Sequence, residues 1–169
     1  PCVYSASFVA MSSLDVLPTI FHSIIVGLIV GIVFIFCRGV FNGFGGKLET
    51  GETIEQAAVR EMREEAGISL ETTDLISHGS IQFHFDDNPD TILHVHIFRA
   101  ETWFGEPKES EEMAPQWFSV SELPFTEMWI SDTHWLPQIL SGKKVSGTCQ
   151  FTSFTHQGGE LRDVNLSFY

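Results

Sequence analysis

The sequence predicts an α/β sandwich, in which helices pack against a core made mostly of strands. Two observations favour this fold: segments of alternating polarity lie on both sides of one strong helix signal, and a second helix signal follows them. A third is size, because 169 residues with 43% hydrophobic and 18% charged side chains are enough for one domain with a sizeable core.

The first distinctive stretch is an apolar segment from Val16 to Cys37, which contains no charged residue. It is long enough to cross a hydrocarbon core of about 30 Å as a helix, and Gly27 and Gly31 have the spacing of a helix-packing motif. Because no Lys or Arg precedes it and Arg38 follows, the positive-inside rule would leave the rest of the chain in the cytosol. One interpretation is therefore that residues 16–37 form a membrane anchor.

Two other interpretations of this segment stay open. Ile, Val and Phe dominate it, so it could equally form a pair of buried strands. Alternatively, the chain begins with Pro1 rather than Met, which suggests that the start is not native coding sequence. We therefore treat residues 1–40 as a hydrophobic N-terminal segment and residues 41–169 as the domain that carries the chemistry.

A helix is predicted over residues 54–66. Thr53 with Gln56 three positions later has the pattern of a capping box, and Gly67 is a typical residue just after a helix end. An apolar residue at every fourth position gives the helix a face to bury.

The same helix carries three carboxylates, Glu61, Glu64 and Glu65, at i, i+3 and i+4, so we expect them to crowd one face. A cation would relieve their repulsion, and hard oxygen ligands suit Mg²⁺ or Mn²⁺. The glycine-rich turn over 43–51 allows a close backbone approach to phosphate or metal. The alternative is a solvated acidic helix face that follows a flexible turn.

Strand signals follow the helix. Alternating residues over 81–85 and 93–97 predict an antiparallel pair joined through 86–90. Residues 116–120 predict another strand, residues 131–140 a second helix, and 145–154 and 163–168 two closing strands. The histidines on the paired strands suggest half-exposed polar positions rather than a metal site, because imidazole does not suit Mg²⁺; they are His84, His94 and His96.

The order of residues around the first helix adds a family resemblance. The defining positions of the Nudix box are all filled, by Gly46, Glu52, Arg60, Glu61, Met62, Glu64, Glu65, Gly67 and Ile68. The chain therefore resembles a Nudix hydrolase. The segments 41–47, 81–85, 94–98, 110–118 and 123–129 are similar to the branch that hydrolyses oxidised purine nucleoside triphosphates such as 8-oxo-dGTP. The resemblance covers about 41–169 and implies an α/β/α sandwich with a mixed sheet, whose first strands would be missing or replaced by the hydrophobic segment.

The resemblance also implies roles on the phosphate side of the substrate. Metal ligands would be Glu61, Glu64, Glu65 and Glu112, with a backbone carbonyl of Gly45 or Gly46. Glu64 or Glu112 would assist deprotonation of the attacking water, and Arg60 would pair with Glu52 to orient the turn. The expected reaction is attack of water at phosphorus, which releases pyrophosphate and a nucleoside monophosphate.

On the base side the resemblance implies six residues: Asn42, Phe83, Met113, Trp129, Ser131 and Asp132. Ordinary core packing is the alternative for Phe83 and Met113. Two positions depart from the family, since Ser131 stands where the first of two aspartates is usual and Phe41 where a tryptophan is usual. Because serine cannot raise its neighbour's pKa by repulsion, we expect Asp132 to be readily ionised and to act mainly as an acceptor.

Charge and cysteine usage limit the partners. The formal net charge of −13 excludes a protein that holds a nucleic-acid polymer, while a free nucleotide carried with its metal is compatible. Three cysteines without zinc spacing fit a reducing compartment. We expect a monomeric cytoplasmic enzyme, anchored to a membrane if residues 16–37 form a helix. Two rival functions remain: a Nudix hydrolase of another nucleoside diphosphate derivative, and a catalytically inactive Nudix-like binding module.

Overall fold

The computed structural model describes residues 21–28, 32–37, 40–109, 115–154 and 159–169, with side chains described for 41, 43–109, 115–154 and 159–169. The strands are Phe21–Leu28 (β1), Ile32–Cys37 (β2), Val40–Asn42 (β3), Leu75–Phe85 (β4), Ile92–Ala100 (β5), Pro115–Phe118 (β6), Val145–Phe151 (β7) and Leu161–Phe168 (β8). The α-helices are Ile54–Ala66 (α1) and Asp132–Leu140 (α2), and three short 3-10 helices are Thr72–Asp74, Val120–Glu122 and Phe125–Glu127. These elements confirm the α/β fold class.

The strands form a mixed five-stranded sheet in the order β1-β5-β4-β7-β8 and a three-stranded sheet in the order β3-β2-β6. The predicted antiparallel pair is confirmed as β4 and β5, and both strands are longer than the alternating pattern indicated. β4 extends back to Leu75 through a register shift between Ser77 and Gly79, so the alternation is broken there and the pattern missed this half. β7 then runs parallel to β4 and antiparallel to β8.

The apolar N-terminal segment supplies strands instead of a helix. β1 pairs in parallel with β5, from Phe21 opposite Leu93 to Leu28 opposite Ala100. β2 pairs antiparallel with both β3 and β6. In the part of the chain that the structure describes, no helix is long and apolar enough to span a membrane. Of the interpretations left open, the described residues agree with strands and not with an anchor helix, in keeping with the β-branched and aromatic residues of the segment. The hydrophobic segment itself supplies β1 and β2.

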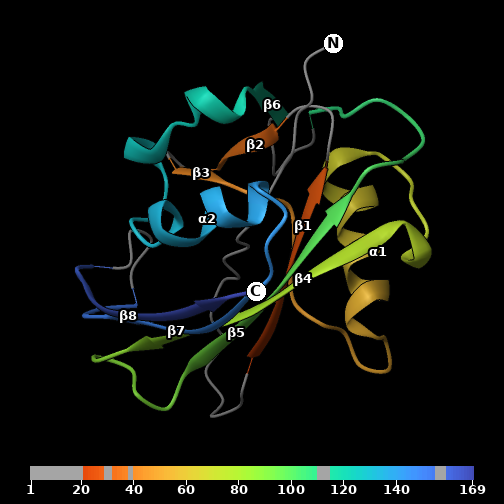
Figure 1. Ribbon diagram of the computed structural model, residues 1–169. Helices are drawn as coiled ribbons and strands as arrows, with labels where there is room; N and C mark the ends of the chain where they lie inside the picture. Colours follow the sequence, from red (N-terminus) through yellow and green to blue (C-terminus); the bar gives the residue numbers. More distant parts are fainter. Residues whose placement is uncertain (1–20, 29–31, 38–39, 110–114, 155–158) are drawn as a thin grey trace.

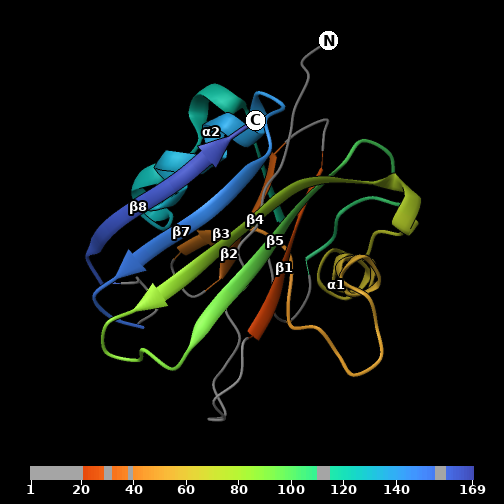
Figure 2. The same cartoon turned by 60° about the horizontal axis from the view of Figure 1, so that its bottom comes forward.

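The two α-helices lie on different sides of the large sheet, with α1 next to β1 and α2 over β7 and β8 (Figures 1 and 2). The small sheet covers the region between α2 and β1 (Figure 1). One hydrophobic core joins these layers, and its largest fully buried side chains are Phe44, Met62, Phe85, Trp135 and Phe151. The site described next lies where α1 meets the turn that follows β3.

Candidate active site

The ends of α1 are fixed by local contacts. Thr53 Oγ1 accepts from the backbone N–H of Gln56 at 3.2 Å, and the Gln56 side chain accepts from Thr53 N at 2.8 Å, which confirms the capping box. Gly67 ends the helix with φ of 68°, a left-handed conformation that favours glycine. These contacts, which do not involve the charged side chains, fix where α1 begins and ends.

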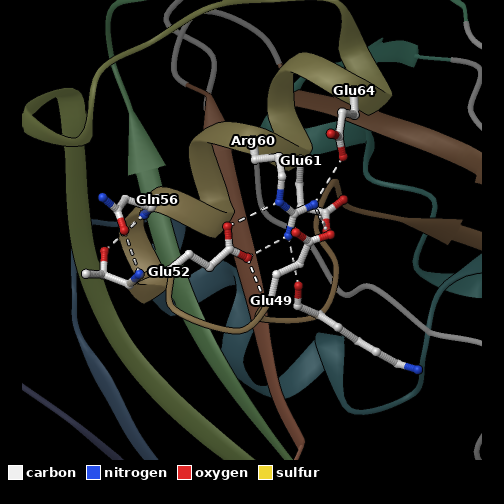
Figure 3. Close-up of polar contacts among 8 residues, drawn as sticks. Glu49, Glu52, Gln56, Arg60, Glu61 and Glu64 are labelled. Atoms are coloured by element: carbon white, nitrogen blue, oxygen red, sulfur yellow. Dashed lines mark hydrogen bonds and ion pairs between the residues drawn. The ribbon is translucent and has the colours of Figure 1, made fainter.

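Arg60 is the centre of an ion-pair cluster that we call the Arg60 cluster, made of Glu52, Arg60, Glu61 and Glu64 (Figure 3). Its Nη2 donates to Glu52 Oε1 at 2.8 Å, and its Nε donates to Glu52 Oε2 at 3.2 Å. Nη2 also donates to the carbonyl of Lys47 at 2.9 Å. These hydrogen bonds connect the glycine-rich turn to α1. They also confirm the predicted pairing of Arg60 with Glu52.

The same guanidinium also gathers two further carboxylates. Arg60 Nη1 donates to Glu61 Oε1 at 2.8 Å and to Glu64 Oε2 at 3.1 Å. The hydrogen bond from Arg60 lowers the pKa of Glu52, and its carboxylate partners raise the pKa of Arg60. Glu52 and Arg60 thus stay charged at neutral pH, and the one guanidinium fixes the positions of three acids at once.

Glu61 lies in a different environment from its neighbours. Burial raises its pKa, and the hydrogen bond and charge of Arg60 counteract this. A Cβ atom placed on Gly46 would overlap the Glu61 carboxylate, so a larger residue there would displace this side chain. The glycine-rich turn therefore packs directly on a carboxylate whose negative charge is poorly solvated.

Glu65 and Glu64 face opposite environments. Glu65 is only 7% exposed, and its Oε2 accepts from the backbone N–H of Gly45 at 2.7 Å. The Glu64 side chain is 57% exposed. Glu61 and Glu65 both meet the glycine turn and Glu64 shares Arg60 with Glu61, which agrees with the expected crowding of the three acids, although their exposure differs. Among the side chains that the structure describes, no three acidic, histidine or cysteine groups lie close enough together to hold a metal ion.

Four of the residues expected on the base side are described with their side chains. Phe83, Trp129, Ser131 and Asp132 are all buried. Phe151 joins two of them, because its ring centroid lies 6.3 Å from that of Phe83 and 5.4 Å from that of Trp129. The sequence did not single out Phe151, since a phenylalanine in a predicted closing strand carries no signal beyond core packing.

The protonation of Asp132 corrects one expectation. Burial raises its pKa to about 7, although the hydrogen bond with Ser131 favours the charged form. The Ser131 hydroxyl donates to Asp132 Oδ1 at 3.3 Å. We expected ready ionisation because serine adds no repulsion, but a side chain 1% exposed loses so much solvation that burial decides the outcome.

The histidines on β4 and β5 contact other polar side chains of the sheet. His94 Nε2 lies 3.0 Å from Ser80 Oγ, and the rings of His94 and His96 have centroids 4.4 Å apart. Their half-buried positions on the sheet agree with the structural interpretation of these residues.

Comparison with known proteins decides the family. The sequence profile of the NUDIX domain matches residues 34–139. The chain belongs to the Nudix family. It is 48% identical to an oxidized purine nucleoside triphosphate hydrolase of Danio rerio over 133 residues, 76% of this chain and 83% of the relative. It is 46% identical to the Mus musculus protein of the same name, over 69% of this chain and 72% of the relative.

The Nudix fold is also found in solved structures that resemble this one. The MutT protein of Bacillus halodurans has a TM-score of 0.70 and 24% identity, over 88% of this chain and 97% of the other. The Nudix match begins at residue 34, inside β2, and so includes the last part of the apolar segment.

The Nudix residues predicted from the sequence fall into three groups. The Arg60 cluster, Glu65 and the glycine turn are brought together. Phe83, Trp129, Ser131 and Asp132 are buried in one core. Glu112 and Met113 lie outside the described residues, and for Asn42 the structure describes only the backbone, in β3 opposite Ile35.

Proposed function

We propose that this Nudix protein hydrolyses oxidised purine nucleoside triphosphates, such as 8-oxo-dGTP and 2-hydroxy-dATP, to the monophosphate and pyrophosphate. The names of the two vertebrate relatives support this substrate class. The observation that carries the proposal is the Arg60 cluster, which holds two helix carboxylates beside a glycine turn. This arrangement suits a polyphosphate accompanied by a divalent cation. The hydrolysis would remove damaged nucleotides from the nucleotide pool.

The metal-donor atoms of the phosphate side suit Mg²⁺, and Mn²⁺ could substitute for it. All are oxygens, Glu61 is poorly solvated, and Glu61 and Glu64 already converge on one positively charged nitrogen. The residues that would hold the ion are Glu61, Glu64, Glu65 and Glu112, with the backbone carbonyl of Gly45 or Gly46. When bound, a divalent cation would neutralise phosphate charge and acidify a coordinated water.

The protein's own groups then have separate tasks. Arg60 fixes the turn and α1 through Glu52 and Lys47, so it orients the acids and does not touch the substrate. Glu65 secures the Gly45 backbone from inside. Glu64 is exposed enough to meet a water molecule, so either it or Glu112 takes the proton as water attacks phosphorus. We call Glu65 and the Arg60 cluster the phosphate side.

The base side consists of Phe83, Trp129, Ser131, Asp132 and Phe151, with Asn42 and Met113 as further candidates. In this proposal Trp129 provides a stacking surface, while Asp132 and Asn42 read the edge of the base. Because the pKa of Asp132 is about 7, its carboxyl is divided between the neutral and ionised forms near neutral pH and can donate or accept. We further propose a cytoplasmic monomer that acts on free nucleotides, in keeping with the net charge of −13.

The test is a turnover assay of the purified protein with Mg²⁺ on 8-oxo-dGTP, 2-hydroxy-dATP and dGTP, with separate detection of pyrophosphate and phosphate. We expect pyrophosphate release, fastest with an oxidised purine. Glu55→Gln is the matched control for variants of the acidic residues, because Glu55 is an exposed acid in the first turn of the same helix. No turnover of any of the three nucleotides, or release of phosphate alone, contradicts the proposal. Faster turnover of another nucleoside diphosphate derivative would favour the first rival function.

A further inference from the structure

The turn between β4 and β5 is bound to the segment that follows β7 through one carboxylate. Asp87 Oδ2 accepts from Ser153 Oγ at 2.6 Å, and Asp87 Oδ1 accepts from the backbone N–H of Phe154 at 2.8 Å. These partners lie 66 and 67 residues away in the sequence. The hydrogen bond from Ser153, followed by that from Phe154, lowers the pKa of Asp87, so both oxygens accept at neutral pH.

The residue held by Asp87 begins a series of aromatic contacts that ends on the base side. Phe154 packs edge-on against Phe85, with ring centroids 4.6 Å apart. Phe85 stacks on Phe151 at 6.0 Å, and Phe151 packs edge-on against Trp129 at 5.4 Å. We call Phe154, Phe85, Phe151 and Trp129 the ring series. Aromatic rings pack at defined angles and have few rotamers, so a shift at one end of the series changes the support at the other.

We propose that Asp87 is a positioning residue for base binding: by holding Ser153 and Phe154 it fixes the ring series on which Trp129 rests. This inference rests on the proposed function, because it takes Trp129 to be a base-binding residue. It assigns Asp87 no contact with the substrate and no part in the chemistry at phosphorus. Its removal is therefore expected to change how well the nucleotide binds and which base is preferred.

The fold offers a neighbouring residue as a matched control. Asp86 lies in the same turn and carries the same charge, but its Oδ1 accepts from Gln150 Nε2 at 2.8 Å and its Oδ2 pairs with Arg162 Nε at 2.8 Å. Neither partner belongs to the ring series. Both aspartates are exposed, so neither replacement leaves a buried unpaired charge and both variants are expected to fold.

The experiment compares Asp87→Ala with Asp86→Ala and with the unaltered protein, using 8-oxo-dGTP and dGTP with Mg²⁺. For Asp87→Ala we expect KM for 8-oxo-dGTP to rise about fivefold, a plausible size for losing the hydrogen bonds of one carboxylate, with kcat within about twofold. The preference for 8-oxo-dGTP over dGTP should fall. Asp86→Ala should leave KM, kcat and preference within about twofold of the unaltered protein.

A second measurement does not depend on turnover. Binding of the product 8-oxo-dGMP, followed by calorimetry without metal, should weaken for Asp87→Ala and not for Asp86→Ala. If Asp87→Ala does not fold, Ser153→Ala takes its place, since it removes one hydrogen bond to the same carboxylate and should give a smaller change in the same direction.

Several results would overturn the inference. One is an Asp87→Ala protein with the KM, kcat and preference of Asp86→Ala. Another is a loss confined to kcat. Both leave the proposed function intact, because the unaltered protein is active. An unaltered protein that hydrolyses none of the tested nucleotides and does not bind 8-oxo-dGMP overturns the proposed function and this inference together.

Discussion

The phosphate side of the candidate site is held by charge, whereas the base side is held by burial. Around Arg60, three carboxylates are fixed by hydrogen bonds from one guanidinium, and Glu64 remains exposed. Around Asp132, the neighbours are aromatic rings and a serine, and the side chain is 1% exposed. In the first region a partner lowers the pKa of an acid and keeps it ionised, and in the second the loss of solvent raises the pKa of an acid to about 7.

This difference shows how one fold can place the two kinds of group that the proposed reaction needs. A polyphosphate with its cation requires fixed negative charge, which an arginine can organise without removing it. A neutral base requires donors and acceptors in a dry environment, where one hydrogen bond discriminates more strongly. Variants that remove charge on the phosphate side should therefore affect different properties from variants that change polar groups on the base side.

The largest expected effect is on turnover at the phosphate side. Glu65→Gln keeps the size of the side chain and removes its charge, so the grip on Gly45 weakens and one proposed metal ligand is lost. We expect kcat to fall on the order of 10²-fold or more. Steady-state kinetics with Mg²⁺ measures this, with Glu55→Gln as the control. Activity within about fivefold of the unaltered protein would contradict a role for this acid.

The next effect is on stability, through Arg60→Lys. A lysine keeps the positive charge but cannot donate to Glu52 at two points and to Glu61 and Glu64 at the same time. We expect the free energy of unfolding to fall by about 2 kcal/mol or more, from lost hydrogen bonds to charged groups. Urea denaturation checks this. Arg63→Lys, at an exposed position of the same helix, should have little effect, and equal losses in both variants would show that the Arg60 cluster does not stabilise the fold.

The contribution of Asp132 to stability should fall as pH rises, whereas that of an acid held in an ion pair rises with pH. The pKa of Asp132 is raised from 3.8 to about 7, so the folded state binds more protons than the unfolded state between these values. Its contribution to stability is therefore present below about pH 4 and is lost as pH rises through about 7. Asp132→Asn removes this dependence.

Chemical denaturation of both proteins at pH 5 and pH 8 measures the effect. The stability of Asp132→Asn relative to the unaltered protein should increase by about 3 kcal/mol between the two pH values, given about 1.4 kcal/mol per pKa unit over the two units between pH 5 and the pKa of about 7. A difference that does not depend on pH would mean that Asp132 is ionised in the folded protein at pH 5.

The two sides also differ in how far the sequence could predict them. The capping box and the end of α1 at Gly67 depend on residues close in the chain, so local patterns indicated them correctly. The pairing of Arg60 with Glu52 followed from the resemblance to the Nudix box. The inward turn of Glu65 was missed because the backbone of Gly45, twenty residues earlier, is its partner. Phe151 and Asp87 were missed because their contacts join segments that are far apart in the sequence.

For the fold too, features that depend on residues close in the chain were predicted, and those that depend on distant residues were not. The antiparallel pair β4 and β5 was predicted from alternation, which records one buried face. The parallel pairing of β1 with β5 could not be predicted, because a strand with apolar residues on both faces has the hydropathy of a membrane helix. Burial of Asp132 is also a property of the assembled core, so the sequence did not indicate that burial raises the pKa of this carboxyl to about 7.

The division of the site into two independent sides is the central claim, and one paired measurement tests it most directly. Glu64→Gln and Ser131→Asp are assayed under the same conditions on 8-oxo-dGTP, 2-hydroxy-dATP and dGTP. Glu64→Gln should lower kcat on all three by a similar factor, on the order of 10²-fold, and leave the ratios among them unchanged. Ser131→Asp should change those ratios about tenfold and leave the highest kcat within about threefold, because it adds an acid beside Asp132 in the buried base side. If Glu64→Gln alters the ratios, or Ser131→Asp leaves all of them unchanged, the two sides do not work as described.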